Sequence, residues 1–376
     1  MKIGVIKQTE NHETRVAITP EGTEALIKLG AQIAVESGAG LASSYTDEEY
    51  VNAGATVLNG RSEVLKQSSI LITVQAPSEE DIRQLQPGTI LISFIWPLQN
   101  RDYLDLLNQH KISALAMDTV PRISRAQSMD ALSSMSNIAG YKAALLGANH
   151  LDRYLPMMMT AAGTIPPAKV LVLGAGVAGL QAIATAKRLG AVVEAFDVRP
   201  VVKEQVESLG ATFVEVEMEE EETESKGGYA KELDERNQIR QREVIHQHAK
   251  KSDIVITTAL IPGRPAPVLI TKEMVKDMKT GSVVVDIAAE QGGNCELTQA
   301  GEVITVDGVK IVGLLNLPGM LAFHASKLYS KNVLSLLSLL IKEEKPVFDF
   351  EDEIILNTTV THDGEIISPF VKENLK

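Results

Sequence analysis

The residues best suited to ligand chemistry gather in one short segment, residues 121–141 (PRISRAQSMDALSSMSNIAGY). It carries Arg122, Gln127, Asp130 and Ser133 among apolar residues that can anchor it. Guanidinium and carboxylate groups make strong, directional hydrogen bonds, so they can orient a polar ligand. A polar loop of this density suggests a surface that faces a ligand. The alternative is a helix N-terminus whose polar residues only cap the helix.

A glycine pattern follows within KVLVLGAGVAGLQAIATAKRLGAVVEAFDVR, residues 169–199. Gly174, Gly176 and Gly179 form G-x-G-x-x-G between a predicted strand and a predicted helix, which is the context that a dinucleotide site requires. The pattern predicts a tight turn, room for a pyrophosphate at the helix N-terminus and close packing of helix on strand. A Rossmann unit that has lost its ligand is the alternative.

Polar and small residues also stand at the ends of the strands predicted next. Asp197 ends the strand after the glycine pattern, where a carboxylate accepts hydrogen bonds from ribose hydroxyls and favours NAD(H) over NADP(H). Arg199 weakens that preference slightly. The ends of two later strands carry Thr257, Ala259 and Leu260, and then Asp286 and Glu290. The small residues leave room for a nucleotide, whereas the two carboxylates could equally be caps or solvated loop residues.

Bulk composition narrows the function classes. The chain has 376 residues, 44% of them hydrophobic, which suits about two domains with ordinary cores. Its net charge of −13 argues against nucleic acids and anionic membrane surfaces, because both require basic patches. A single cysteine, Cys295, rules out an internal disulfide and fits a reducing compartment. We see no metal-ligand spacing, secretion signal or membrane-spanning apolar run, and therefore expect a soluble protein without a metal site.

Short β-rich runs alternate with helical patterns along the chain, which is typical of parallel strands joined by crossover helices. A first series of predicted strands covers residues 3–6, 33–36, 70–74, 89–94 and 112–117. A second series covers residues 169–173, 192–197, 213–216, 254–258, 283–287 and 310–312. The sequence therefore predicts an α/β protein made of two doubly wound, Rossmann-like domains with a cleft between them.

The order of these segments also predicts the domain boundaries. The first domain is expected to comprise residues 1–135 and 325–376, and the second, an NAD(H)-binding Rossmann domain, residues 136–324. Helical segments near 133–154 and 320–343 would carry the chain out of the first domain and back. A strand at 353–356 would then complete that domain.

An acidic run, EVEMEEEETE at residues 215–224, precedes a glycine pair. Because like charges repel and glycines loosen the backbone, we expect a mobile excursion. It is either a solvated loop without function or a flap over a ligand, closed by Tyr229.

Four separated motifs point to one family: RISRAQSMD at 122–130, MMMTAAGTIPPAKVLVLGAGVAGLQAIATAKRLGA at 157–191, GGYAKE at 227–232 and TTALIPGRPAPVLIT at 257–271. They closely resemble the NAD(H)-binding component (alpha subunit, domain I) of proton-translocating NAD(P) transhydrogenase. The resemblance implies hydride transfer between NADH bound here and NADP⁺ on a partner beta subunit, coupled to proton translocation by a membrane-spanning subunit. It also implies a homodimer in the cytoplasm, held at the inner (plasma) membrane through its partners.

The resemblance assigns roles to individual residues. It places Arg122, Gln127, Asp130 and Ser133 against the nicotinamide, with Gln127 able to bridge the two nucleotides because its amide both donates and accepts. Around the NAD it places Val177, Asp197, Val198, Arg199, Gly228, Gln241 and Leu260, with Tyr229 on a mobile loop. The three glycines of the pattern, Ala178 and Ala259 complete the predicted cofactor site.

The N-terminal sequence GVIKQTENHETRVAITPEG also resembles alanine dehydrogenase, which has the same two-domain fold. That family shares Arg15 but uses a lysine and a histidine on its oxoacid. In register, these positions hold Gln75 and Trp96, which supply neither a titratable amine nor a proton shuttle. We therefore expect no reductive amination. A stand-alone amino acid dehydrogenase and a non-enzymatic NAD(H)-responsive binding module remain the alternatives.

Overall fold

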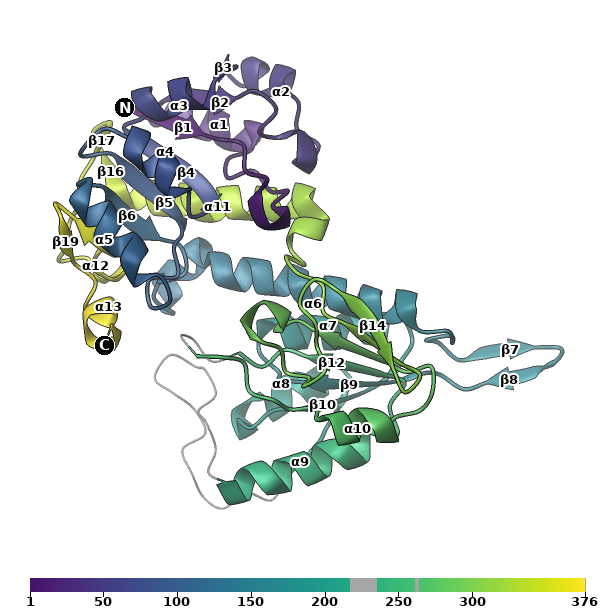
Figure 1. Cartoon of the computed structure of the whole chain (residues 1–376). Coiled ribbons are helices and arrows are strands. Elements are labelled where there is room, and N and C mark those ends of the chain that lie inside the picture. The colour runs from purple at the N-terminus through teal and green to yellow at the C-terminus, as the bar shows by residue number, and fades with distance from the viewer. Residues whose placement is uncertain (217–234, 261–263, 376) are drawn as a thin grey trace. The chain divides into compact units, whose positions relative to one another are not determined.

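The computed structural model describes residues 1–216, 235–260 and 264–375. It divides into two compact units: unit 1 is Met1–Met135 with Gly319–Lys376, and unit 2 is Ser136–Pro318 (Figure 1). The chain returns to unit 1 at Gly319, whereas the sequence pattern placed that return at residue 325. Most of the acidic run lies outside the described residues.

Unit 1 is built on an eight-stranded sheet in the order β19-β18-β6-β5-β4-β1-β2-β3. Its parallel strands are β1 (Lys2–Val5), β2 (Gln32–Glu36), β3 (Thr56–Leu58), β4 (Ile70–Gln75), β5 (Ile90–Phe94) and β6 (Ser113–Ala116). This is the doubly wound order, in which the winding reverses between β1 and β4. Two antiparallel strands, β18 (Thr359–His362) and β19 (Glu365–Ile366), extend the sheet beyond β6.

Unit 2 repeats the plan with seven strands in the order β11-β10-β9-β12-β13-β15-β14. They are β9 (Lys169–Leu173), β10 (Val192–Phe196), β11 (Thr212–Phe213), β12 (Ile254–Thr257), β13 (Val283–Asp286), β15 (Val309–Val312) and the antiparallel edge strand β14 (Val303–Val306). The winding reverses between β9 and β12. The prediction of an α/β protein with two doubly wound, Rossmann-like domains is therefore confirmed.

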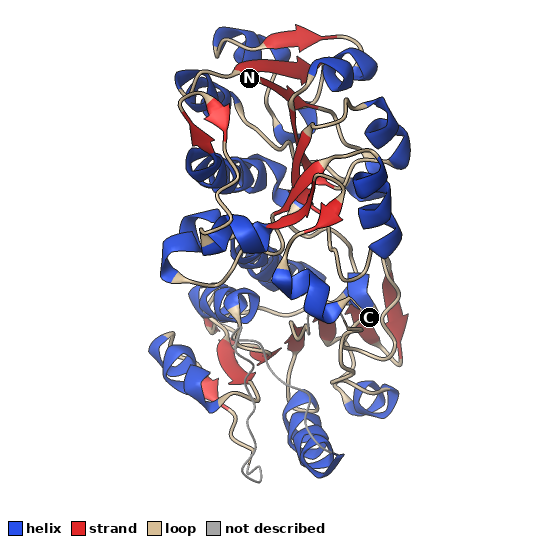
Figure 2. Cartoon of the chain, turned by 90° about the vertical axis from the view of Figure 1, so that its left-hand side faces the viewer, coloured by secondary structure: helices blue, strands red, loops and turns tan. Residues whose placement is uncertain are grey.

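Helices lie on both sides of the strands (Figure 2). In unit 1 they are α1 (Pro20–Lys28), α2 (Asp47–Asn52), α3 (Arg61–Gln67), α4 (Glu79–Gln84), α5 (Arg101–Gln109), α11 (Ala322–Leu340), α12 (Glu353–Thr358) and α13 (Pro369–Asn374). In unit 2 they are α7 (Val177–Arg188), α8 (Lys203–Ser208), α9 (Glu235–Ala249) and α10 (Lys272–Asp277). The long helix α6 (Ala131–His150) begins in unit 1 and continues into unit 2.

Two small pairs of strands stand apart from the main sheets. The hairpin of β7 (Met158–Thr160) and β8 (Gly163–Ile165) projects from unit 2, and Met159 on it is 76% exposed (Figure 1). The other pair, β16 (Ile341–Lys342) and β17 (Lys345–Pro346), follows α11.

Local sequence explains where the elements begin and how they pack. Thr46 and Glu49 form a capping box at α2, since each side chain accepts the other residue's backbone N–H. The central strands of unit 2 are buried on both faces, with Val170, Ile254 and Val283 in one core cluster and Leu171 on the other side of the sheet. Parallel strands covered on both faces read as continuous apolar runs, which is why the sequence located them well.

Two predicted strands differ in the structure. Residues 353–356 form the start of α12, because Asp352 caps the helix by accepting the N–H of Ile354 at 2.8 Å. The strand that extends the unit 1 sheet is β18, which starts at Thr359, immediately after this helix. The strand predicted at 213–216 is shorter, since β11 ends at Phe213.

Candidate functional site

The three glycines after β9 have different structural roles. Gly174 has a positive φ of 97°, and a Cβ there would lie 2.5 Å from Thr258 Oγ1. A Cβ on Gly179 would lie 1.8 Å from the carbonyl oxygen of Gly174, so this glycine permits the close packing of α7. At Gly176, by contrast, no described atom lies within 4 Å of the Cβ position. Its lack of a side chain leaves open space beside the backbone.

The first turn of α7 fits an anion. No side chain among the described residues caps it, and Gly176 occupies its N-cap position. Such a turn carries unsatisfied N–H groups and the positive end of the helix dipole. The turn is held in place by α6, where a Cβ on Gly140 would lie 2.0 Å from the oxygen of Ala178. Val177 begins α7 and is 36% exposed. The residues present therefore suit a dinucleotide pyrophosphate.

Asp197 lies directly after β10 and joins that strand to the glycine turn. Its Oδ2 accepts the N–H of Ala175 at 2.7 Å, and its Oδ1 accepts the N–H of Arg199 at 2.9 Å. The Arg199 side chain donates to both carboxylate oxygens, at 2.9 and 2.8 Å. The Arg199 charge is thus paired with Asp197, which reduces its pull on a 2′-phosphate. Val198 lies between the paired residues.

The two later carboxylates have structural partners. Asp286 is 1% exposed and accepts from Thr257 Oγ1, Thr298 Oγ1 and the backbone N–H groups of Ala288 and Cys295. It therefore ties the end of β12 to the segment that follows β13. Glu290 accepts the N–H of Asn316 at 2.6 Å. Of the two alternatives left open by the sequence, the structure favours structural roles for both.

Asn294 is a residue that sequence reasoning missed. It is fully buried, and its side chain accepts the N–H of Ala259 at 3.0 Å while donating to the Ala259 carbonyl at 2.8 Å. It also donates to the carbonyl of Pro267 at 2.8 Å. The segment with Ala259 and Leu260 is thus held by an amide side chain 35 residues further along the chain. Nothing local in the sequence signals such a contact.

The remaining predicted cofactor residues are placed less closely. Gln241 lies on α9 and is 8% exposed. Gly228 and Tyr229 lie outside the described residues, as do residues 261–263.

The polar loop of unit 1 contains a 3₁₀ helix, η3 (Ser124–Met129), followed by Asp130 at the start of α6. Asp130 accepts the N–H of Ser133 at 2.8 Å and its hydroxyl at 2.5 Å. The structure therefore brings these two predicted residues together, in the capping arrangement weighed as the alternative. Arg122 and Gln127 lie exposed on the same loop.

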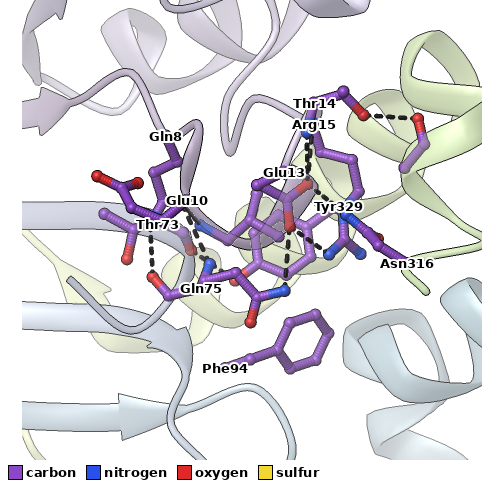
Figure 3. Close-up of polar contacts among 12 residues, drawn as sticks. Gln8, Glu10, Glu13, Thr14, Arg15, Thr73, Gln75, Phe94, Asn316 and Tyr329 are labelled. Atoms are coloured by element: carbon purple, nitrogen blue, oxygen red, sulfur yellow. Dashed lines mark hydrogen bonds and ion pairs between the residues drawn. The ribbon is translucent and has the colours of Figure 1, made fainter. Parts of the chain in front are cut away.

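A second polar cluster lies where the unit 1 sheet reverses its winding (Figure 3). Arg15 and Glu13 are both nearly buried and form a two-point ion pair, with both N···O distances at 2.7 Å. Gln75 donates to Glu13 at 3.0 Å, and Gln8 is hydrogen-bonded to the backbone of residues 74–75. Burial by itself raises the pKa of Glu13, but hydrogen bonds and charge from Arg15 outweigh it and lower the pKa below 4.5.

This cluster has no apparatus for oxoacid chemistry. The Arg15 charge is matched by Glu13, and position 75 contributes an amide rather than a titratable amine. Trp96 stacks near Phe94, with ring centroids 5.8 Å apart. An indole neither accepts nor shuttles a proton. The cluster is therefore a buried support at the carboxyl ends of β1 and β4.

Two further searches concern metals and membranes. The described side chains include no group of three or more His, Cys, Asp or Glu residues arranged to hold a metal ion. Within the ranges that the structure describes, no helix combines the length and apolar character needed to cross a bilayer.

Comparison with known proteins decides the family. The N-terminal domain of alanine dehydrogenase/PNT matches residues 4–139, and the C-terminal domain of the same family matches residues 143–369. The chain belongs to the alanine dehydrogenase/PNT family. It is 49% identical to the first of the separate chains that make up NAD(P) transhydrogenase subunit alpha in Rhodospirillum rubrum, over 98% of each chain. A transhydrogenase structure from Sinorhizobium meliloti covers 98% of this chain and all of its own, with a TM-score of 0.86 and 44% identity.

Alanine dehydrogenases are more distant members. The enzyme of Methanococcus maripaludis is 33% identical over 86% of this chain and 82% of its own length. These comparisons confirm the resemblance stated from the motifs, and they group the chain with enzyme subunits of the NAD(P) transhydrogenase type.

The open space at Gly176 gives a first test. Gly176→Ala should leave the free energy of unfolding nearly unchanged, because its Cβ meets nothing, yet weaken NADH binding by about tenfold or more, equivalent to roughly 1.4 kcal/mol. Gly179→Ala should instead destabilise the fold by about 1–3 kcal/mol through overpacking. Denaturant unfolding and NADH titration of both variants measure this. Undiminished NADH affinity in Gly176→Ala would place the pyrophosphate elsewhere.

The buried ion pair gives a second test. Glu13→Gln leaves Arg15 charged and unpaired, so it should destabilise the protein by about 3–5 kcal/mol at pH 7. Because folding lowers the pKa of Glu13, the wild-type advantage is complete above pH 4.5 and shrinks as the pH falls below it. Denaturant unfolding at several pH values measures both effects. The exposed pair partner Glu79, changed to Gln, is the control and should cost little.

Proposed function

We propose that this chain is the NAD(H)-binding component of a proton-translocating NAD(P) transhydrogenase. The observation that carries the proposal is the turn after β9. It combines open space at Gly176, an uncapped first turn of α7 among the described residues, and Asp197 fixed beside the turn. The 49% identity to a chain of a transhydrogenase subunit alpha supports the same function.

The residues of unit 2 would divide the binding between them. The α7 N-terminus would hold the pyrophosphate, and Asp197 would accept the ribose hydroxyls, since a carboxylate has lone pairs left after accepting the Ala175 and Arg199 donors. Val177, Ala178, Val198, Gln241, Ala259 and Leu260, with Gly228 and Tyr229, would enclose the remainder of the dinucleotide. Asn294 would keep the Ala259 segment in place from behind.

The chemistry asks little of acids and bases. When bound, NADH supplies a hydride that passes from its C4 to the C4 of NADP⁺, giving NAD⁺ and NADPH with no proton exchanged in the transfer itself. The chain therefore has to orient the ring and exclude misalignment. We assign this to Arg122, Gln127, Asp130 and Ser133. Asp130 and Ser133 are already joined by two hydrogen bonds, while Arg122 and Gln127 are exposed for contact.

The proposal extends to the assembly. NADP(H) would be bound by a partner beta subunit, and a membrane-spanning subunit would couple hydride transfer to proton translocation. The chain would act in the cytoplasm as a homodimer, attached to the inner membrane through these partners. Co-purification with the membrane subunits and sedimentation of the isolated chain test the partners and the dimer.

Cofactor preference tests the role of Asp197. The isolated chain should bind NADH much more tightly than NADPH, because the carboxylate repels a 2′-phosphate. Asp197→Asn should narrow the gap, since it removes the negative charge and releases Arg199. Fluorescence titration with both reduced cofactors measures the ratio. Equal affinities in the wild type would contradict the assignment.

Reconstitution tests the function itself. The chain mixed with a purified NADP(H)-binding component should transfer hydride from NADH to an NADP⁺ analogue. Gln127→Asn should slow the transfer with little change in NADH affinity, because the shorter side chain shifts the contact without removing its chemistry. Gln109→Asn, at an exposed position on α5, is the matched control.

Each alternative function has its own readout in the same preparation. Oxidation of alanine by NAD⁺ with the chain alone would establish an amino acid dehydrogenase instead. NADH binding without any transfer to the NADP(H) component would leave a binding module. An unchanged rate in Gln127→Asn would remove Gln127 from the mechanism.

A further inference from the structure

One carboxylate joins the ends of two neighbouring strands in unit 1. Asp118 lies just after β6, and its two oxygens accept the N–H groups of Ile95 at 2.7 Å and Trp96 at 3.0 Å, just after β5. Trp96 has a φ of +53°, which is rare for a bulky residue and is maintained only where surroundings enforce it. The two adjacent N–H groups both point to one side chain, so Asp118 fixes this left-handed turn.

The loop with Arg122 and Gln127 begins directly after Asp118. Further along it is tied down by a two-point ion pair from Arg125 to Asp352, at 2.7 and 2.8 Å. Asn332 on α11 holds the loop again, by donating to the Ser128 carbonyl at 2.9 Å. These tethers come from residues that leave Arg122 and Gln127 exposed. The loop is therefore held from behind while its front side chains stay available.

The carboxylate is kept ionised against its surroundings. Burial raises the pKa of Asp118 to about 6, while hydrogen bonds from backbone N–H groups, including those of Ile95 and Trp96, oppose the shift. Tyr329 on α11, and Glu13 and Arg15 after β1, are the titratable or charged groups around it in the described structure. The pKa of Glu13 lies below 4.5 and that of Tyr329 well above 10, so neither titrates near pH 6.

The chemistry explains why an ionised group is needed there. A carboxylate offers an acceptor oxygen to each of two N–H groups, whereas an amide offers one oxygen and turns an NH₂ against the second donor. We propose that ionised Asp118 is a positioning residue for hydride transfer, which clamps the Ile95–Trp96 turn and thereby sets the start of the loop that carries Arg122 and Gln127. The role in transfer rests on the proposed function, whereas the clamp itself does not.

The single tryptophan of the sequence, Trp96, reports on the clamp without any partner. Trp96 emission of the full chain should change with a midpoint near pH 6 as Asp118 takes up a proton. Asp118→Asn should abolish this transition, and Asp118→Glu should retain one. Asp105→Asn, at an exposed position on α5, is the matched control and should behave as the wild type.

Hydride transfer in the reconstituted complex tests the consequence. At a pH of about 7.5, where the carboxylate is ionised, Asp118→Asn should lower the transfer rate by about tenfold or more with NADH affinity nearly unchanged, because small misplacements of orienting groups slow reactions steeply. Asp118→Glu should recover much of the rate, which a variant that merely misfolds would not show. The wild-type rate should also fall below about pH 6, and this fall should be absent from the residual activity of Asp118→Asn.

The outcomes separate the clamp from the proposed function. An emission transition near pH 6 that persists in Asp118→Asn would overturn the clamp, and a wild-type transfer rate in that variant would overturn the positioning role. If the wild-type chain transfers no hydride at all, the proposed function fails, and the Trp96 titration still decides whether Asp118 clamps the turn.

Discussion

Backbone N–H groups at the carboxyl ends of parallel strands are the constraint on which this structure depends. A parallel sheet ends in donors that have no further strand to pair with, and burying them unpaired is costly. In unit 2, Asp197 accepts the N–H of Ala175, and Asn294 accepts that of Ala259. In unit 1, Asp118 accepts two such donors. The first turn of α7 differs, since no described side chain caps it, and this leaves its donors for a ligand.

The carboxylates at the strand ends of unit 1 are of two kinds. Arg15 and Glu13 neutralise each other at the winding reversal, so the pair stiffens the region without attracting a charged substrate. Asp118 is satisfied by backbone donors and its pKa is raised by burial, so its ionised state is held at the expense of stability. A charge that folding disfavours is more informative about function than one that folding rewards.

These features suit a protein whose reaction consists of alignment. Hydride transfer between two nicotinamides requires neither a general acid nor a general base, and the cluster at Gln75 offers none. What the structure provides is rigidity: a loop tethered by Arg125 and Asn332, a glycine turn pinned by Asp197, and a strand end held by Asn294. Such supports keep orienting groups within the small tolerance that near-attack geometry allows.

The sequence by itself determined the fold class, the doubly wound order and the glycine turn, because these depend on local periodicity and on a short contiguous pattern. It also located the family through its motifs, including the loop with Arg122 and Gln127. It placed Asp130 and Ser133 correctly on one loop but could not show that they pair as a helix cap. The strand predicted at 353–356 was wrong, because a single capping residue, Asp352, decided between helix and strand.

Only the tertiary structure identified the residues that hold the site from behind. Asn294 reaches Ala259 across 35 positions of sequence, Asp118 reaches Trp96 across 22, and Arg125 reaches Asp352 across 227. Their residue types carry no local signal, since a polar side chain in a loop has the same pattern whether it is solvated or buried against a distant N–H group. The pairing of such groups is decided by which strands become neighbours in the sheet, and that is a property of the folded chain.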